Sequence, residues 1–352
     1  MTKRERAFAA IHRREPGRTP RHVRFSPPML EAFRQRTGAE DPEVYFDLEL
    51  TYAVEPEPVG PQEDPRSLFA PYLPELPAGT TVDRFGRAFV PGSFHHFTRI
   101  VHPLRDAQEA GELDDYPWPQ WAPQPSERLS QQVRALRNQD RFVVGDGGSV
   151  WETSWQLRGM DRLFFDMLEN PAFAARLLDG VADARCDAVR GLAAAGVDML
   201  RIVDDVGMQD RMMMNPAMWR AWLKPRLARI INAARAVNPA LLIQYHSDGW
   251  IEAIIEDLVE VGVNLLDPVQ PECMDPAEMK RRYGDRLAFF GTVGTQSTFP
   301  FGTPQEVARV VRERIETVGA GGGLIIAPTH VLEPDVPWEN VEAFLEAVAK
   351  YG

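Results

Sequence analysis

The chain has 352 residues, with 39 Lys or Arg against 51 Asp or Glu, so its formal net charge is −12. No basic cluster marks a surface for nucleic acid or for an anionic membrane, which excludes both as partners. Two cysteines, Cys186 and Cys273, are too few for a disulfide framework, and no apolar run approaches the roughly 20 residues that span a bilayer. We therefore expect a cytoplasmic protein.

The first part of the chain, residues 1–140, has no regular periodicity. Many of its prolines fall in two runs, 52–79 and 114–127. Proline lacks a backbone donor and favours turns, so these runs predict long loops packed over a scaffold, with plain linkers as the alternative.

From residue 141 the pattern becomes regular. Short apolar runs bounded by Gly, Pro or Asp predict strands within 141–148, 197–205, 241–249, 263–270, 287–294 and 322–330. Stretches of helical period lie between most of them, including 215–237, 250–262 and 303–319. This alternation predicts an α/β fold with parallel strands. At this length a (β/α)8 TIM barrel forming one domain over 1–352 is expected, with the regular βα repeats in 141–352.

Polar residues end nearly every predicted strand. They are Asp146, Asp204, Asp205, His246, Asp248, Asp267, Gln270 and His330. The carboxyl ends of barrel strands converge on one mouth, where such enzymes keep their chemistry. We therefore expect one constellation, against the alternative that strand ends are polar only because they meet water.

His246 and Asp248 are the sharpest candidates. Two residues apart on an extended segment, they project from the same face, and His330 would add a second imidazole across the mouth. Two nitrogens and one oxygen suit zinc or another divalent metal. Alternatively, Asp248 caps a helix starting at Trp250, His246 bonds a backbone carbonyl, and His330 is a general acid without metal.

Asp204 and Asp205 are adjacent on a strand, so their side chains face opposite ways. Only one should enter the mouth, while the other satisfies backbone groups or a helix end.

Several segments together resemble the uroporphyrinogen decarboxylase superfamily, which includes porphyrinogen decarboxylases and methyltransferases that work with corrinoid proteins. They are residues 245–249, 262–296, 301–316 and 321–344, and the likeness begins at 2–20. The resemblance implies a (β/α)8 barrel whose irregular, Pro-rich N-terminal extension, within 1–140, lies over the mouth. It also implies a homodimer.

Porphyrinogen decarboxylases resemble this chain at Arg24, Asp47 and His330. In that family the aspartate binds pyrrole N–H groups and arginines bind carboxylates. The chain departs from that family at three positions. Pro28 stands where the family has an arginine, Trp155 where it has a tyrosine and Asp205 where it has a serine. Losing a cation and adding a carboxylate weakens a pocket for a polyanionic tetrapyrrole, so true uroporphyrinogen decarboxylation is not expected.

The corrinoid-linked methyltransferases hold zinc with a His-x-Cys pair and a later Cys, and these positions match His246, Asp248 and His330. The leading hypothesis is methyl transfer between a small substrate and a corrinoid protein or related acceptor, with zinc or another divalent metal at these three residues. The predicted catalytic residues are Asp47, Asp205 and His330. The predicted substrate contacts are Arg24, Trp155, Asp204 and Gln270.

Two alternatives remain. In a decarboxylase or lyase acting on a small carboxylate, Arg24 would bind the acid, and His330 or Asp47 would protonate the carbanion. In a non-catalytic barrel, the same mouth would bind a small ligand without turning it over.

Overall fold

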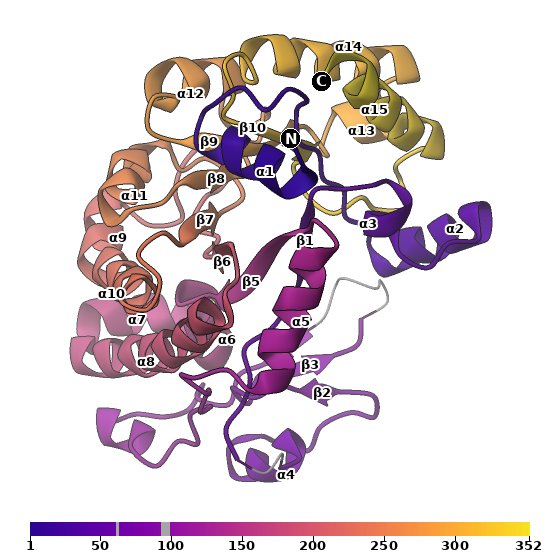
Figure 1. Ribbon diagram of the computed structural model, residues 1–352. Helices are drawn as coiled ribbons and strands as arrows, with labels where there is room; N and C mark the ends of the chain where they lie inside the picture. The colour runs from indigo at the N-terminus through magenta and orange to yellow at the C-terminus, as the bar shows by residue number, and fades with distance from the viewer. Residues whose placement is uncertain (61–62, 93–98) are drawn as a thin grey trace.

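The computed structural model describes residues 1–60, 63–92 and 99–352. Its main feature is a parallel sheet in the order β1-β5-β6-β7-β8-β9-β10, curled into a barrel (Figure 1). Its strands are β1 (Leu50–Val54), β5 (Phe142–Gly148), β6 (Met199–Val203), β7 (Leu242–His246), β8 (Leu265–Asp267), β9 (Ala288–Val293) and β10 (Leu324–Pro328). The six strands predicted beyond residue 140 are all present, and the predicted α/β barrel is confirmed.

Residues 20–25 occupy the position between the two edge strands β10 and β1. Arg21 forms a parallel bridge with Ile326 of β10, and the His22 N–H donates to the carbonyl of Ile326 at 3.0 Å. On the other side, the Tyr52 ring of β1 lies 5.0 Å from the His22 ring. This extended segment therefore adds an eighth position to the barrel wall.

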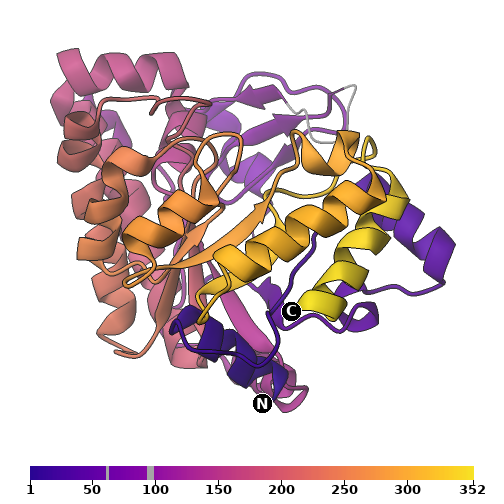
Figure 2. The same cartoon turned by 90° about the horizontal axis from the view of Figure 1, so that it is seen from above.

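Most helices cover the outside of the barrel (Figure 2). They are α5 (Glu127–Asn138), α6 (Trp151–Arg158), α7 (Met160–Glu169), α8 (Pro171–Ala195), α9 (Pro216–Trp222), α10 (Lys224–Arg235), α11 (Ile255–Val261), α12 (Pro276–Tyr283), α14 (Pro304–Thr317) and α15 (Trp338–Tyr351). The helix expected over 215–237 is divided into α9 and α10 next to Pro225, which lacks the N–H that would continue the ladder. The structure also has α2 (Pro27–Thr37) and the short helices α3 (Pro42–Tyr45), α13 (Thr298–Phe301) and η3 (Glu252–Ile254).

The Pro-rich runs are mostly loops, as predicted, although Pro61 and Gln62 lie outside the described residues. Two short elements, α4 (Pro65–Leu68) and η1 (Ala70–Tyr72), interrupt the first run, and η2 (Ala110–Leu113) directly precedes the second. A small antiparallel sheet that the sequence did not predict joins β2 (Thr81–Val82), β3 (Ala88–Val90) and β4 (Arg99–Val101). Strand β4 of this sheet contacts α6, and η2 contacts α8. The strands of the sheet have only two or three residues, too few to show a period.

The inside of the barrel changes character from one end to the other. Helix α1 (Lys3–Ile11) closes the N-terminal end, where its Ala7 and Ile11 belong to one apolar cluster with Leu242 of β7. Along β7 the next inward positions are Gln244 and then His246, both buried. The interior is therefore apolar at the closed end and polar toward the mouth. None of the described helices is long and apolar enough to cross a membrane.

Candidate metal centre at the barrel mouth

His246, at the carboxyl end of β7, is held by a buried carboxylate. Its Nδ1 lies 2.8 Å from Oδ2 of Asp267, which ends β8, and the two residues are 4% and 1% exposed. The same oxygen accepts from Nε2 of Gln244 at 2.8 Å and Nε of Arg201 at 3.2 Å. Burial acts to raise the pKa of Asp267, but His246 and Arg201 outweigh it and hold the pKa below its usual range. A charged acceptor fixes the proton on Nδ1 and leaves the Nε2 lone pair free.

Nε2 of His246 faces two carboxylates. It lies 3.9 Å from Oδ1 of Asp205 and 3.9 Å from Oδ1 of Asp248. These distances are too long for hydrogen bonds, but two bonds of about 2.0–2.2 Å to one shared ion would bridge them. Ligand atoms of the three residues lie within 4.8 Å of one another. Among the described residues, no Lys or Arg forms an ion pair with either carboxylate, so the cluster suits a cation.

The adjacent acids at the end of β6 do different work. The buried Asp204 carboxylate accepts from the backbone N–H groups of Val150, Trp151 and Glu152, at 3.0, 2.7 and 3.3 Å, and so satisfies the first turn of α6. Asp205 faces the mouth, where its Oδ1 accepts from the Asp248 N–H at 2.9 Å. The structure thus gives Asp204 a capping role, and the substrate contact expected of it does not fit its position.

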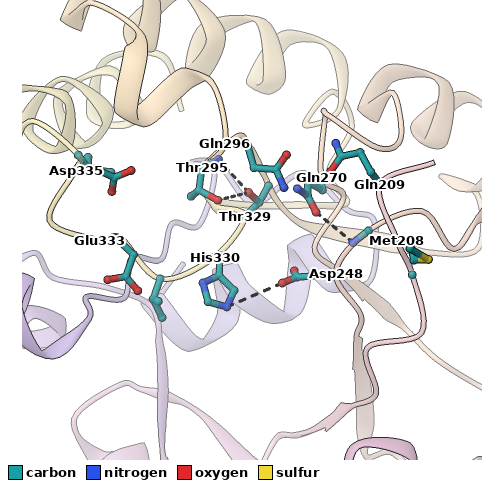
Figure 3. Close-up of a pocket in the computed structure, with 14 residues that line it drawn as sticks. Met208, Gln209, Asp248, Gln270, Thr295, Gln296, Thr329, His330, Glu333 and Asp335 are labelled. Atoms are coloured by element: carbon teal, nitrogen blue, oxygen red, sulfur yellow. Dashed lines mark hydrogen bonds and ion pairs between the residues drawn. The ribbon is translucent and has the colours of Figure 1, made fainter. Parts of the chain in front are cut away.

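His330 and Gln270 lie beside the cluster in a pocket of about 380 Å³ (Figure 3). Nε2 of His330 is 4.0 Å from Oδ2 of Asp248, and its side chain is half exposed. Partial burial lowers the pKa of His330, although Asp248 opposes this, so the ring is neutral at pH 7. Gln270 accepts from the Gly249 N–H at 3.1 Å and holds the loop that carries Asp248.

The alternative roles considered for His246 and Asp248 do not match their contacts. The helix after Asp248 begins at Glu252 and has no side-chain cap. Nδ1 of His246 bonds a carboxylate and not a backbone carbonyl.

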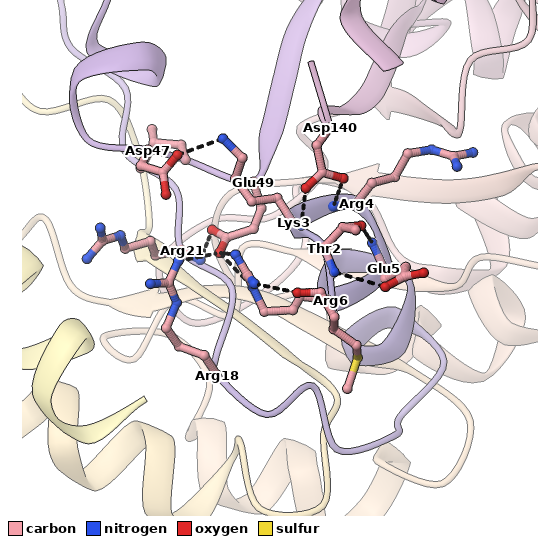
Figure 4. A network of polar contacts seen from close by, with 12 residues as sticks. Thr2, Lys3, Arg4, Glu5, Arg6, Arg18, Arg21, Asp47, Glu49 and Asp140 are labelled. Carbon is pink, nitrogen blue, oxygen red and sulfur yellow. Dashed lines mark hydrogen bonds and ion pairs between the residues drawn. The ribbon is translucent and has the colours of Figure 1, made fainter. Parts of the chain in front are cut away.

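Two predicted site residues lie elsewhere. Asp47 precedes β1, at the closed end of the barrel, where its Oδ1 accepts from Nζ of Lys3 at 2.6 Å (Figure 4). Trp155 packs against the core from α6 and does not line the pocket. The catalytic role expected of Asp47 and the substrate role expected of Trp155 do not fit these positions, because barrel chemistry gathers at the opposite ends of the strands.

Arg24 lies inside the barrel wall without a carboxylate partner. Its guanidinium stands 5.6 Å from the centre of the Tyr52 ring, and no described carboxylate forms an ion pair with it. Burial and the neighbouring Arg201 lower its pKa.

Sequence reasoning missed the role of one acid near the mouth and the presence of another. Asp267 was noted at a strand end, but its role in orienting His246 was not foreseen. Glu55 directly follows β1, and burial together with Asp146 raises the pKa of Glu55 to about 7. Glu55 is a polar residue at a strand end, like the acids that were predicted, but the prolines around it prevented the prediction of β1.

Comparison with known proteins identifies the family. The family model for uroporphyrinogen decarboxylase (URO-D) matches residues 99–351, so the chain belongs to the uroporphyrinogen decarboxylase family, as its sequence resemblance indicated. Uroporphyrinogen decarboxylase of Pseudoalteromonas translucida (strain TAC 125) is 24% identical over 285 residues, which cover 76% of this chain and 74% of the relative.

Two methyltransferases are also similar. Methylcobamide:CoM methyltransferase MtaA of Methanosarcina barkeri is 28% identical over 174 residues, covering 49% of this chain and 48% of the relative. A methyltransferase from Methanosarcina mazei has a solved structure that superposes with a TM-score of 0.68 at 19% identity, covering 100% of this chain and 99% of that one. The solved structure shows the same fold, and the named relatives include both decarboxylases and methyltransferases.

Proposed function

We propose that this protein is a metal-dependent methyltransferase that moves a methyl group between a small substrate and a corrinoid protein or a related acceptor. The observation that carries the proposal is the cluster of Asp205, His246 and Asp248, whose ligand atoms lie within 4.8 Å of one another. Among the described residues, no lysine or arginine forms an ion pair with its carboxylates. The name of the Methanosarcina barkeri relative, a methylcobamide:CoM methyltransferase, supports the same reaction class.

In this proposal His246, Asp248 and Asp205 hold the metal. His330, which the sequence also predicted as a ligand, lies beside Asp248 and acts as a base. Nitrogen and oxygen donors fit zinc and other divalent ions. Such an ion would supply Lewis acidity, which lowers the pKa of a substrate thiol or hydroxyl. Asp267 orients the His246 ring through Nδ1, and Gln270 fixes the loop of Asp248.

The neutral His330 ring faces the pocket from the end of β10 and can take a proton from the substrate. The backbone N–H of Asp205 donates to the Glu152 carboxylate at 3.1 Å, which fixes the position of Asp205 in the cluster. The proposed mechanism therefore places the proton acceptor directly beside the metal ligands, with His330 Nε2 4.0 Å from Oδ2 of Asp248.

The reaction can be tested with metal-loaded protein, free reduced cobalamin and a panel of methyl-bearing ethers, amines and thioethers. We expect the wild type to form methylcobalamin, followed by its absorbance spectrum, with at least one substrate class. The Asp248→Ala variant should form it at least a hundredfold more slowly. Equal rates in the wild type and the variant would contradict the proposal.

A second candidate, decarboxylation of a small carboxylate, is favoured by Arg24, which has no ion-pair partner among the described residues. In that case Arg24→Met should abolish release of carbon dioxide from a small-carboxylate panel without changing metal content. Metal-free protein that releases carbon dioxide would favour this candidate over methyl transfer.

A further inference from the structure

Two neighbouring loops carry the three proposed metal ligands. The β6 loop, residues 204–208, holds Asp205, and the β7 loop, residues 246–250, holds His246 and Asp248. His246 is the last residue of its strand, but both aspartates lie beyond the strand ends, where the sheet no longer fixes the backbone. Contacts between the loops must therefore hold the two carboxylates at the distance that a shared ion needs.

The backbones of the two loops are hydrogen-bonded on both sides of the aspartates. The Asp204 N–H donates to the His246 carbonyl at 2.9 Å, and the Trp250 N–H donates to the Met208 carbonyl at 2.7 Å. The two loops thus continue the pairing of β6 and β7 beyond the ends of the strands.

A buried hydroxyl joins the loops between these two bonds. Ser247 is fully buried, and its hydroxyl oxygen accepts from the Val206 N–H of the β6 loop at 3.1 Å. The same hydroxyl donates to the Asp248 carbonyl at 3.2 Å. Because Val206 directly follows Asp205, this hydroxyl connects the backbone next to one carboxylate ligand with the backbone of the other.

The close approach of the two loops depends on glycine. A Cβ atom at Gly207 would lie 2.4 Å from the Asp248 carbonyl oxygen, and one at Gly249 would lie 2.6 Å from the Met208 carbonyl oxygen. Cβ atoms essentially never come within 3.0 Å of such an atom, so Gly207→Ala would separate the loops by at least about 0.6 Å. The β7 loop is held in place against such a shift, because the Gly249 N–H donates to the buried Gln270 side chain at 3.1 Å.

We propose that Gly207 and Ser247 are positioning residues of the metal centre, which hold the two loops at the spacing that lets Asp205, His246 and Asp248 bind one ion. The inference rests on the proposed function, because it concerns the same metal centre. Ligands must be held within about 0.5 Å of their productive positions, so a shift of about 0.6 Å is enough to weaken binding. Gly207 has no side chain and the Ser247 hydroxyl is bonded to both loops, so each residue acts through the loops and not on the ion.

Zinc affinity per folded molecule, measured by competition with a chelator, tests the role of Gly207. Gly207→Ala should lower it about 10–100-fold. Gly191→Ala on α8 is the matched control, because its Cβ would lie 2.2 Å from the Ala122 carbonyl oxygen, away from the mouth. This control should lower the stability of the fold and leave zinc affinity unchanged. The absorption spectrum of cobalt-loaded protein reports ligand geometry, and it should change in Gly207→Ala but not in Gly191→Ala.

Ser247→Ala is a second, independent variant, because it removes the bridging hydroxyl without a steric clash. It should lower zinc affinity about threefold to tenfold, the effect of losing one buried hydrogen bond. Ser154→Ala is its matched control, since Ser154 is also fully buried and its hydroxyl has no hydrogen-bond partner in the part of the chain that the structure describes. Zinc affinity should be unchanged in this control.

Wild-type zinc affinity in folded Gly207→Ala would overturn the inference, and so would an equal loss in Gly191→Ala. If Gly207→Ala does not fold, unchanged affinity in Ser247→Ala would overturn it. In each of these cases the wild type still binds zinc, so the proposed metal centre stands. Wild type that binds no zinc contradicts the metal centre and, with it, the inference.

Discussion

The two ends of the barrel both hold buried carboxylates, but these carboxylates have different partners. At the closed end, Glu49 is fully buried and bonds Arg6 and Arg18 at 3.3 and 3.2 Å (Figure 4). Nearby Asp198, also fully buried, bonds Arg4 and Arg137 at 2.8 and 2.5 Å. At the mouth, Asp267 still pairs with Arg201, but Asp205 and Asp248 face histidines and each other.

The partners of these carboxylates indicate different roles, in stability at the closed end and in chemistry at the mouth. Burying a carboxylate costs free energy that an opposite charge can offset, and at the closed end arginines supply that charge. At the mouth, the ion-pair partners of Asp205 and Asp248 among the described residues are the His246 and His330 rings, at 3.9–4.0 Å. Burial and Asp205 raise the pKa of Asp248, as expected when a carboxylate lacks a cation. This difference supports the proposed cation site at the mouth.

The largest expected loss of stability is at the closed end. Asp198→Ala removes the shared acceptor of Arg4, Arg137 and the Val143 N–H, so the free energy of unfolding should fall by about 2–4 kcal/mol. Chemical denaturation measures this change. Metal affinity per folded molecule should stay at the wild-type value. A variant as stable as the wild type would contradict a stabilising role for the carboxylates at the closed end.

A smaller effect is expected behind the metal centre. Asp267→Asn keeps the shape of the side chain but removes the charge that orients His246, so metal affinity should fall about 10–100-fold. Competition with a chelator measures the affinity. The matched change Asp257→Asn disrupts pairs with Arg220 and Lys224 on the outside of the barrel and should leave affinity unchanged. Equal losses in both variants would show a general effect on folding.

The smallest effect concerns Glu55, whose pKa is raised from 4.5 to about 7. Between these values the folded protein binds more protons than the unfolded chain, so this group makes stability fall as pH rises. Glu55→Gln should therefore stabilise the protein at pH 8 and not at pH 4, by less than about 1 kcal/mol because the partly buried carboxylate remains open to solvent, which screens its charge. Thermal unfolding at the two pH values tests this, with Glu346→Gln, an exposed change on α15, as control.

The sequence was most informative where strands are long and apolar. Beyond residue 140 the alternation predicted all six strands, and their last residues pointed to His246, Asp248 and His330. It was least informative before residue 140, where residues 20–25 enter the barrel wall through isolated bridges that leave no periodic pattern. Asp47 was expected at the site from the family resemblance alone. Because β1 was not predicted, nothing in the sequence showed that Asp47 precedes this strand, at the closed end of the barrel. The ring–carboxylate contact of His246 and Asp267 depends on neighbouring strands, which no local pattern reveals.

The most direct test of the account is the metal content of protein purified without a metal-affinity column, by elemental analysis of the wild type, Asp248→Ala and Asp140→Ala. Asp140 binds the backbone of α1 at the closed end and serves as the matched acid. We predict about one equivalent of zinc or another divalent metal in the wild type and in Asp140→Ala, and its loss in Asp248→Ala. Metal-free wild type that stays metal-free after incubation with zinc, or equal metal in all three proteins, would contradict a metal centre at the mouth.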